Sequence, residues 1–234
     1  MGMRALPVIA LAALLTFTGC ASVSVRNVER SRAAVERPQV FHVADFQVEG
    51  GEWNITSRSK SVAQYQRDTQ DLLADALVKN LNAYLGPARR VGRSDRVPPN
   101  GWLITGRFIR VSEGSPGLRV VIGLGAGGSK LETETVVYHQ PGSHFLRFGT
   151  SGGSNAMPGM IMSSGPVGAV SNAVQQVNKG VRDDTKRTAR MITGSIAEYM
   201  AERGWIDEVS LKAKRPGEFQ LLQPQGTPRR KARN

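Results

Sequence analysis

The spacing of apolar residues changes between residues 48 and 59. Over residues 41–48, apolar and polar positions alternate imperfectly up to Gly50-Gly51, which predicts a strand ending at a turn. Over residues 59–85, apolar positions recur at steps of three and four, and Gly86-Pro87 stops the run. This second segment is predicted to be one long amphipathic helix.

Alternation returns in the middle of the chain. Residues 102–111, 118–122 and 130–138 each have the pattern of a strand, and residues 144–148 follow the turn signal Pro141-Gly142. Several neighbouring strands after one long helix favour an antiparallel arrangement over alternating strand–helix units.

A second helix is expected to begin at Asp183-Asp184, which would cap it, and to end at Gly204. Trp205-Ile206 would then pack back on the core. We therefore expect an α+β domain over residues 40–208. Its mainly antiparallel sheet would have four to five strands, with two helices packed on one face.

The N-terminus has the pattern of a bacterial signal peptide. Arg4 precedes an apolar run from Ala5 to Phe17, and small residues lead to Cys20, the only cysteine. The run of about 13 residues is too short for the ~20 that span a bilayer. The site resembles a lipobox, so residues 1–19 would be removed and Cys20 would carry a diacylglycerol and an N-acyl chain.

The residues around Cys20 also suggest where in the cell the protein is located. Ala21 follows the cysteine instead of Asp, and by resemblance to Gram-negative lipoproteins this favours the outer membrane, on its periplasmic face. Acylation would remove a lone thiol exported to an oxidising compartment. Residues 20–39 are polar and basic, and we expect them to form a flexible tether.

The chain is strongly basic, with 31 Lys+Arg against 19 Asp+Glu and a formal charge of +12. An envelope protein does not meet chromosomal DNA, so we exclude nucleic acid as a partner and favour an anionic envelope component. Candidate contacts are Arg89, Arg90, Arg93 and Arg96. Residues 209–234 are basic and proline-rich, and are expected to be a disordered tail.

A long segment rich in glycine and methionine, without charge up to residue 178, is expected as an insertion at residues 149–180. It is either a mobile loop or a contact surface, since methionine adapts to varied apolar surfaces and small residues permit close approach. In the second case the contacts with membrane or partner would be Met157, Met160, Ile161, Met162 and Val167.

Motifs for catalysis or cofactor binding are weak. Residues 123–128 match G-x-G-x-x-G, but a strand pattern follows where a dinucleotide site needs a helix. His139 and His144 flank a turn and make a poor metal site by themselves. We expect no enzyme activity, no metal and no cofactor.

A Phe-x-Val-x-Asp-Phe strand at residues 41–46, the long helix, and the block Val-Ile-Gly-Leu-Gly-Ala-Gly-Gly-Ser at residues 121–129 together resemble a known group. It is the bacterial envelope lipoproteins gathered under domain of unknown function 4410, and the resemblance runs from about Phe41 to Trp205. It implies an α/β fold and an envelope location, and it supplies no catalytic residues.

These observations favour a non-enzymatic outer-membrane lipoprotein that binds an envelope protein or assembles with itself. The first alternative is a binder of an anionic polymer, peptidoglycan or lipopolysaccharide, through the arginine cluster. The second is a hydrolase of unknown type.

Overall fold

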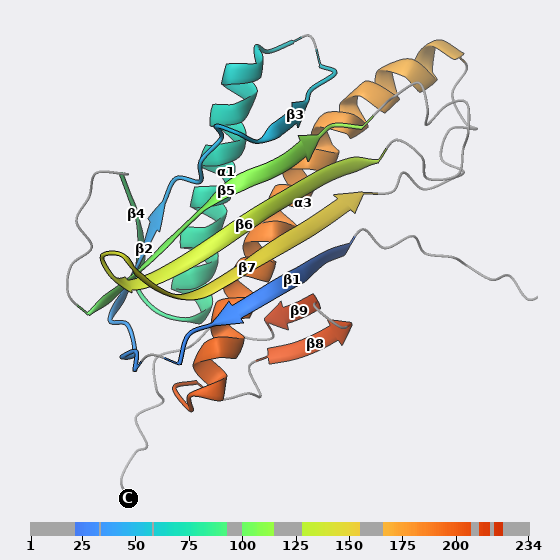
Figure 1. Cartoon of the computed structure of the whole chain (residues 1–234). Coiled ribbons are helices and arrows are strands. Elements are labelled where there is room, and N and C mark those ends of the chain that lie inside the picture. Colours follow the sequence, from blue (N-terminus) through green and yellow to red (C-terminus); the bar gives the residue numbers. More distant parts are fainter. Residues whose placement is uncertain are drawn as a thin grey trace, which may run out of the picture.

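The computed structural model describes residues 22–32, 34–57, 59–92, 100–114, 128–154, 166–206, 211–215 and 218–221. A β-sheet forms one layer, and the helices α1 (Val62–Tyr84) and α3 (Pro166–Glu202) form a second layer on one of its faces (Figure 1). The strands of the sheet are β1 (Ser22–Arg30), β2 (Val40–Ala44), β3 (Glu52–Asn54), β4 (Ala88–Val91), β5 (Gly101–Ser112), β6 (Ser129–Gln140) and β7 (Ser143–Ser154).

The strand order is β1-β7-β6-β5-β2-β4, with β3 beside β5. The long strands β1, β7, β6 and β5 pair antiparallel, whereas β2, β3 and β4 join by parallel pairing. The α+β class and the two helices on one face are confirmed. The predicted four to five strands were too few, because β3 and β4 are too short to show alternation.

The predicted alternation in β5 and β6 separates the two faces of the sheet. Ile104, Phe108 and Leu131 are buried beneath the helices. The opposite face, which no described element covers in Figure 1, carries cross-strand ion pairs. There, Glu134 pairs with Arg107 at 2.7 Å and with Arg147 at 3.7 Å.

Helix α1 lies where its periodicity predicted it. The Ser61 hydroxyl caps its first turn by accepting a hydrogen bond from the Gln64 amide at 3.2 Å. At the other end, the amides of Leu85 and Gly86 both donate to the Leu81 carbonyl. Gly86 has a φ of 152°, which side-chain-bearing residues rarely adopt, so the predicted stop is confirmed.

Helix α3 starts much earlier than predicted. Asp184 lies in the middle of the helix, whose first residue is Pro166. The expected insertion at 149–180 is therefore wrong at both ends, since residues 149–154 belong to β7 and residues 166–180 to α3. The strand β7 needs a glycine at position 153, because a Cβ there would lie 2.6 Å from the Ser129 carbonyl oxygen of β6.

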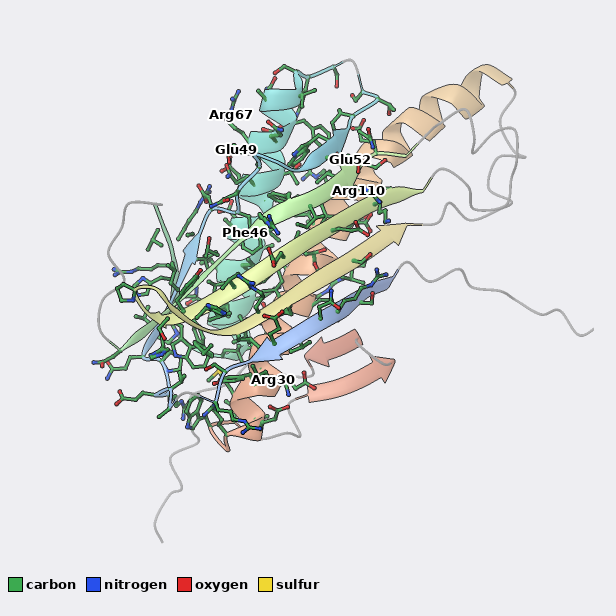
Figure 2. The ribbon with its side chains drawn as sticks, in the orientation of Figure 1. Arg30, Phe46, Glu49, Glu52, Arg67 and Arg110 are labelled. Atoms are coloured by element: carbon green, nitrogen blue, oxygen red, sulfur yellow. The ribbon has the colours of Figure 1, made fainter. Side chains whose placement is uncertain are left out.

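The segment expected to be a flexible tether is largely part of the domain. β1 pairs with β7 at residues 22–26 and again at residues 29–30, on either side of a shift in register, and Val23 is only 2% exposed. Arg30 reaches α3, where it pairs with Glu202 at 2.7 Å and Glu198 at 3.3 Å (Figure 2). Residues 22–25 alternate serine with valine, which is itself a strand pattern, but the polar and basic residues that follow led to the expectation of a tether.

The C-terminal region expected to be disordered contains a hairpin, β8 (Leu211–Arg215) with β9 (Glu218–Leu221). It lies beside β1 and α3 in Figure 1. Before it, Gly204 ends α3 as predicted, with a φ of 68°. Trp205 packs on the buried Trp102 with ring centroids 5.9 Å apart, which confirms its predicted return to the core. No helix in the described part is long and apolar enough to cross a membrane.

Candidate functional site

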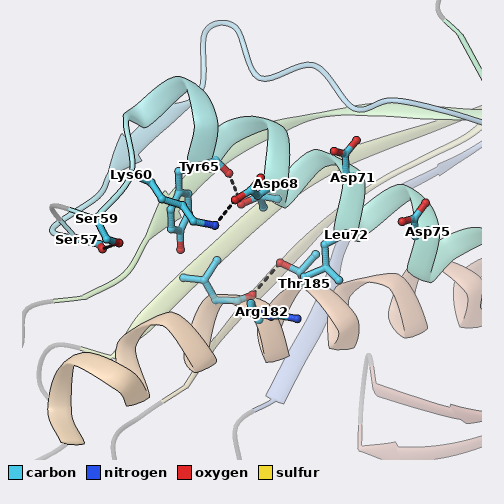
Figure 3. Close-up of a pocket in the computed structure, with 12 residues that line it drawn as sticks. Ser57, Ser59, Lys60, Tyr65, Asp68, Asp71, Leu72, Asp75, Arg182 and Thr185 are labelled. Atoms are coloured by element: carbon cyan, nitrogen blue, oxygen red, sulfur yellow. Dashed lines mark hydrogen bonds and ion pairs between the residues drawn. The ribbon is translucent and has the colours of Figure 1, made fainter. Parts of the chain in front are cut away.

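A cleft of about 470 Å³ lies between the N-terminal half of α1 and the middle of α3 (Figure 3). Helical spacing places Asp68, Asp71 and Asp75 along one side, at steps of three and four residues. Leu72 lies among them, and α3 contributes Val181, Arg182 and Thr185 to the opposite wall.

The acidic side of the cleft is only partly neutralised. Lys60 pairs with Asp68, and the guanidinium of Arg90 on β4 contacts Asp71 at 2.6 Å. Asp75 is 3.7 Å from the same guanidinium, and its side chain is 72% exposed. Asp75 is therefore the carboxylate on this wall that is most accessible to a cationic group.

Tyr65 lines the inner end of the cleft, where it is 9% exposed. Burial raises the pKa of its phenol, and a hydrogen bond with the nearby Glu113 carboxylate and the charge of that group raise it further. Glu113 is fully buried at the end of β5 and accepts hydrogen bonds from the amides of Thr56 at 2.8 Å and Ser57 at 2.7 Å. This carboxylate therefore holds the segment that leads into α1.

A second buried carboxylate lies on α3. Asp184 accepts a 2.6 Å hydrogen bond from the Ser129 hydroxyl and a 2.5 Å bond from the Arg187 guanidinium. Burial raises the pKa of Asp184, and these two donors oppose that rise. Both buried carboxylates are held by donors from the protein and stabilise the junction between sheet and helices.

The geometry suits recognition of a chain that presents a basic side chain beside an apolar one. The exposed carboxylates would attract the cation, and Leu72, Val181 and Tyr65 offer an apolar surface between them. The described residues contain no group of His, Cys, Asp or Glu side chains that could hold a metal ion.

Of the four arginines predicted to form a cluster, Arg89 and Arg90 are among the described residues. Arg90 contacts Asp45 at 2.6 Å as well as Asp71, so its guanidinium ties β4 to β2 and α1. The Arg89 guanidinium donates to the His42 ring at 3.3 Å. Arg93 and Arg96 lie outside the described residues.

The other predicted sites also fall mainly outside the described residues, namely Cys20, Met157, Met160, Ile161 and Met162. Val167 lies in the first turn of α3. The predicted strand at 118–122 is outside as well, as are residues 123–127 of the glycine block.

The sequence analysis did not predict the cleft between α1 and α3. The aspartates of α1 look like an ordinary solvated helix face, and only the packing of α3 against α1 makes them one wall of a cleft. The usable sequence signal was the spacing of Asp68, Asp71 and Asp75 around Leu72.

A family model described as "Domain of unknown function (DUF4410)" matches residues 29–171. The chain belongs to this family. The DUF4410 match begins at the end of β1 and ends inside α3, so it spans strands β2 to β7, α1 and the start of α3. This confirms the resemblance suggested by the glycine block and the first strand.

Solved structures give a much weaker likeness. Two dodecamers of PelC from Paraburkholderia phytofirmans, one of them a point variant, are 12% and 11% identical to this chain. Each match covers 70% of this chain and 97% of the PelC chain, with TM-scores of 0.32 and 0.31. This chain has no match among the curated proteins.

Proposed function

We propose that this DUF4410 protein is a non-enzymatic lipoprotein, anchored through Cys20 to the periplasmic face of the outer membrane, whose domain binds another envelope protein. The anchor is supported by the short apolar run before Cys20 and by Ala21 after it. Lipid on Cys20 would hold the domain at the membrane surface without a spanning segment.

The cleft between α1 and α3 is the observation that carries partner binding. It has room for one or two side chains, an apolar inner surface and an accessible carboxylate, Asp75. The partner would present a Lys or Arg next to an apolar residue. A second copy of this basic chain is another possible source of such a segment.

The decisive experiment is affinity capture of the lipidated protein from its native envelope, with cleft variants. Leu72→Arg would fill the cleft and place a cation where a cation must bind, so we expect loss of the captured partner. Arg67→Ala changes an exposed α1 residue that does not line the cleft, and should leave capture intact. Unchanged capture by a correctly folded Leu72→Arg protein would refute the proposal.

The uncharged segment is kept as a second proposed contact, with membrane or partner, through Met157, Met160, Ile161, Met162 and Val167. The test of this contact requires substitutions and not a deletion, because removing residues 151–168 would shorten β7 and α3. Replacing Met157, Met160 and Met162 by serine changes apolarity and leaves both elements whole. Unaltered membrane association and oligomeric state in that variant would argue against the contact.

A further inference from the structure

Residues from four strands form a row at one end of the sheet. Ser112 of β5 pairs with Lys130 of β6, Lys130 pairs with Gly153 of β7, and Gly153 pairs with Ser22 of β1. Ser22 follows Cys20 by two positions, and two residues span at most about 7 Å. A lipid on Cys20 would therefore hold this end of the sheet against the membrane surface.

A shallow hollow of about 380 Å³ lies at the same end, between β1, β7 and β6. The hollow forms because β7 contributes only small residues there, Ser151, Gly152 and Gly153. Gly153 cannot be replaced by a larger residue without a shift, since a Cβ would lie 2.6 Å from the Ser129 carbonyl oxygen. Arg26 and Lys130 rise on either side, and the lining contains no carboxylate.

The charges around the hollow leave it positive. Lys130 pairs with Glu132 at 3.0 Å, but the Glu132 carboxylate also lies 3.9 Å from Arg110 and accepts a hydrogen bond from Ser151. Arg110 has a nearer partner in Glu52, at 2.7 Å, and Figure 2 shows the two side by side. The charges of Lys130, Arg110 and the two carboxylates therefore balance, and the net positive charge of the hollow comes from Arg26. Arg26 is exposed and has no ion-pair partner among the described residues.

We propose that this hollow binds the phosphate of an anionic phospholipid head group, phosphatidylglycerol, in the membrane that holds the Cys20 lipid. The inference rests on the proposed lipid anchor. Arg26 would engage the phosphate through its planar N–H groups, Lys130 would add a point charge, and the glycine floor would admit the head group between them. The end of the sheet with the β6–β7 turn at Pro141-Gly142 then points away from the membrane (Figure 1).

The test uses the full lipidated protein in nonionic detergent and a soluble probe, glycerophosphoglycerol, followed by NMR. We expect saturable shifts of the Arg26 side-chain N–H and of the Gly152 and Gly153 amides. Arg26→Gln should weaken binding about fivefold, the scale of one exposed ion pair. Arg67→Gln, which removes an exposed arginine from α1, should leave the affinity unchanged.

Each outcome decides the matter. Absent shifts, or equal affinity of Arg26→Gln and the parent protein, would overturn the site. Equal affinity for inorganic phosphate at the same ionic strength would overturn the lipid assignment and leave a general phosphate site. Mass spectrometry of the peptide containing Cys20 reports the anchor separately, so an unmodified Cys20 with intact head-group binding would refute the anchor and not the hollow.

Discussion

The hydroxyl of Ser129 donates a 2.6 Å hydrogen bond to the carboxylate of Asp184, and both side chains are buried. The bond joins the first residue of β6 to the middle of α3. It also fixes α3 at the point where Val181 and Thr185 form one wall of the cleft.

The stability that depends on Asp184 should change with pH. Its pKa is raised in the folded protein, so between the ordinary value of 3.8 and the raised value the folded state binds more protons than the unfolded state. Unfolding free energy from this group therefore falls as pH rises through that window, by about 1.4 kcal/mol for a pKa difference of one.

Asp184→Asn removes this titration. We expect urea unfolding to show the parent protein gaining stability over Asp184→Asn as the pH falls from 7 towards 4. Asp75→Asn, which makes the same chemical change at a largely exposed position, serves as the matched control. A difference between parent and Asp184→Asn that is constant with pH would contradict the assignment.

Gly106 should be far less tolerant of a methyl group than Gly149, although both lie in long strands. A Cβ at Gly106 would be 2.1 Å from the Glu134 carbonyl oxygen and 2.5 Å from the ring of Phe46. At Gly149 the nearest atoms are 3.6 Å away, an ordinary contact. We expect Gly106→Ala to cost about 3 kcal/mol in chemical denaturation and Gly149→Ala much less; similar costs would show that β5 does not approach β6 this closely.

Strand β1 should behave as part of the sheet in hydrogen exchange. Because β1 lies at the edge of the sheet, alternate amides of residues 24–26 pair with β7, and these are expected to exchange slowly, whereas those of a tether would exchange at once. Val23→Asp would bury a charge and should abolish the protection. Val28→Asp, in the same strand but 44% exposed in the parent, should preserve it. Fast exchange of every amide in residues 24–26 of the parent protein would disprove the pairing of β1 with β7.

Arg90 is expected to act mainly as a structural tie. Arg90→Gln removes contacts to Asp45 and Asp71, and we expect a loss of about 1 kcal/mol in unfolding free energy that shrinks at high salt. Arg67→Gln, an exposed position on α1, provides the comparison. If Arg90→Gln instead leaves stability unchanged and weakens binding to peptidoglycan or lipopolysaccharide, the arginine cluster would be a polymer site.

Local signals in the sequence were sufficient for several elements. The helix α1 follows from apolar positions such as Leu73 and Leu77 and from the glycine stop at Gly86. The β6–β7 hairpin follows from alternation around Pro141-Gly142, and the end of α3 from Gly204. Each of these three elements is predicted by residues of the element itself or by the turn next to it.

Other features depended on partners far away in the chain. β1 is a strand because Ser22–Arg30 finds hydrogen-bond partners on β7, and Asp184 is buried because β6 brings Ser129 to α3. The cleft exists because α1 and α3 pack side by side, although most strands of the sheet lie between them in the sequence. The sequence by itself determined which residues can form a helix, turn or buried face. Only the tertiary structure decided which faces meet, because strand pairing and helix packing depend on contacts that no local pattern records.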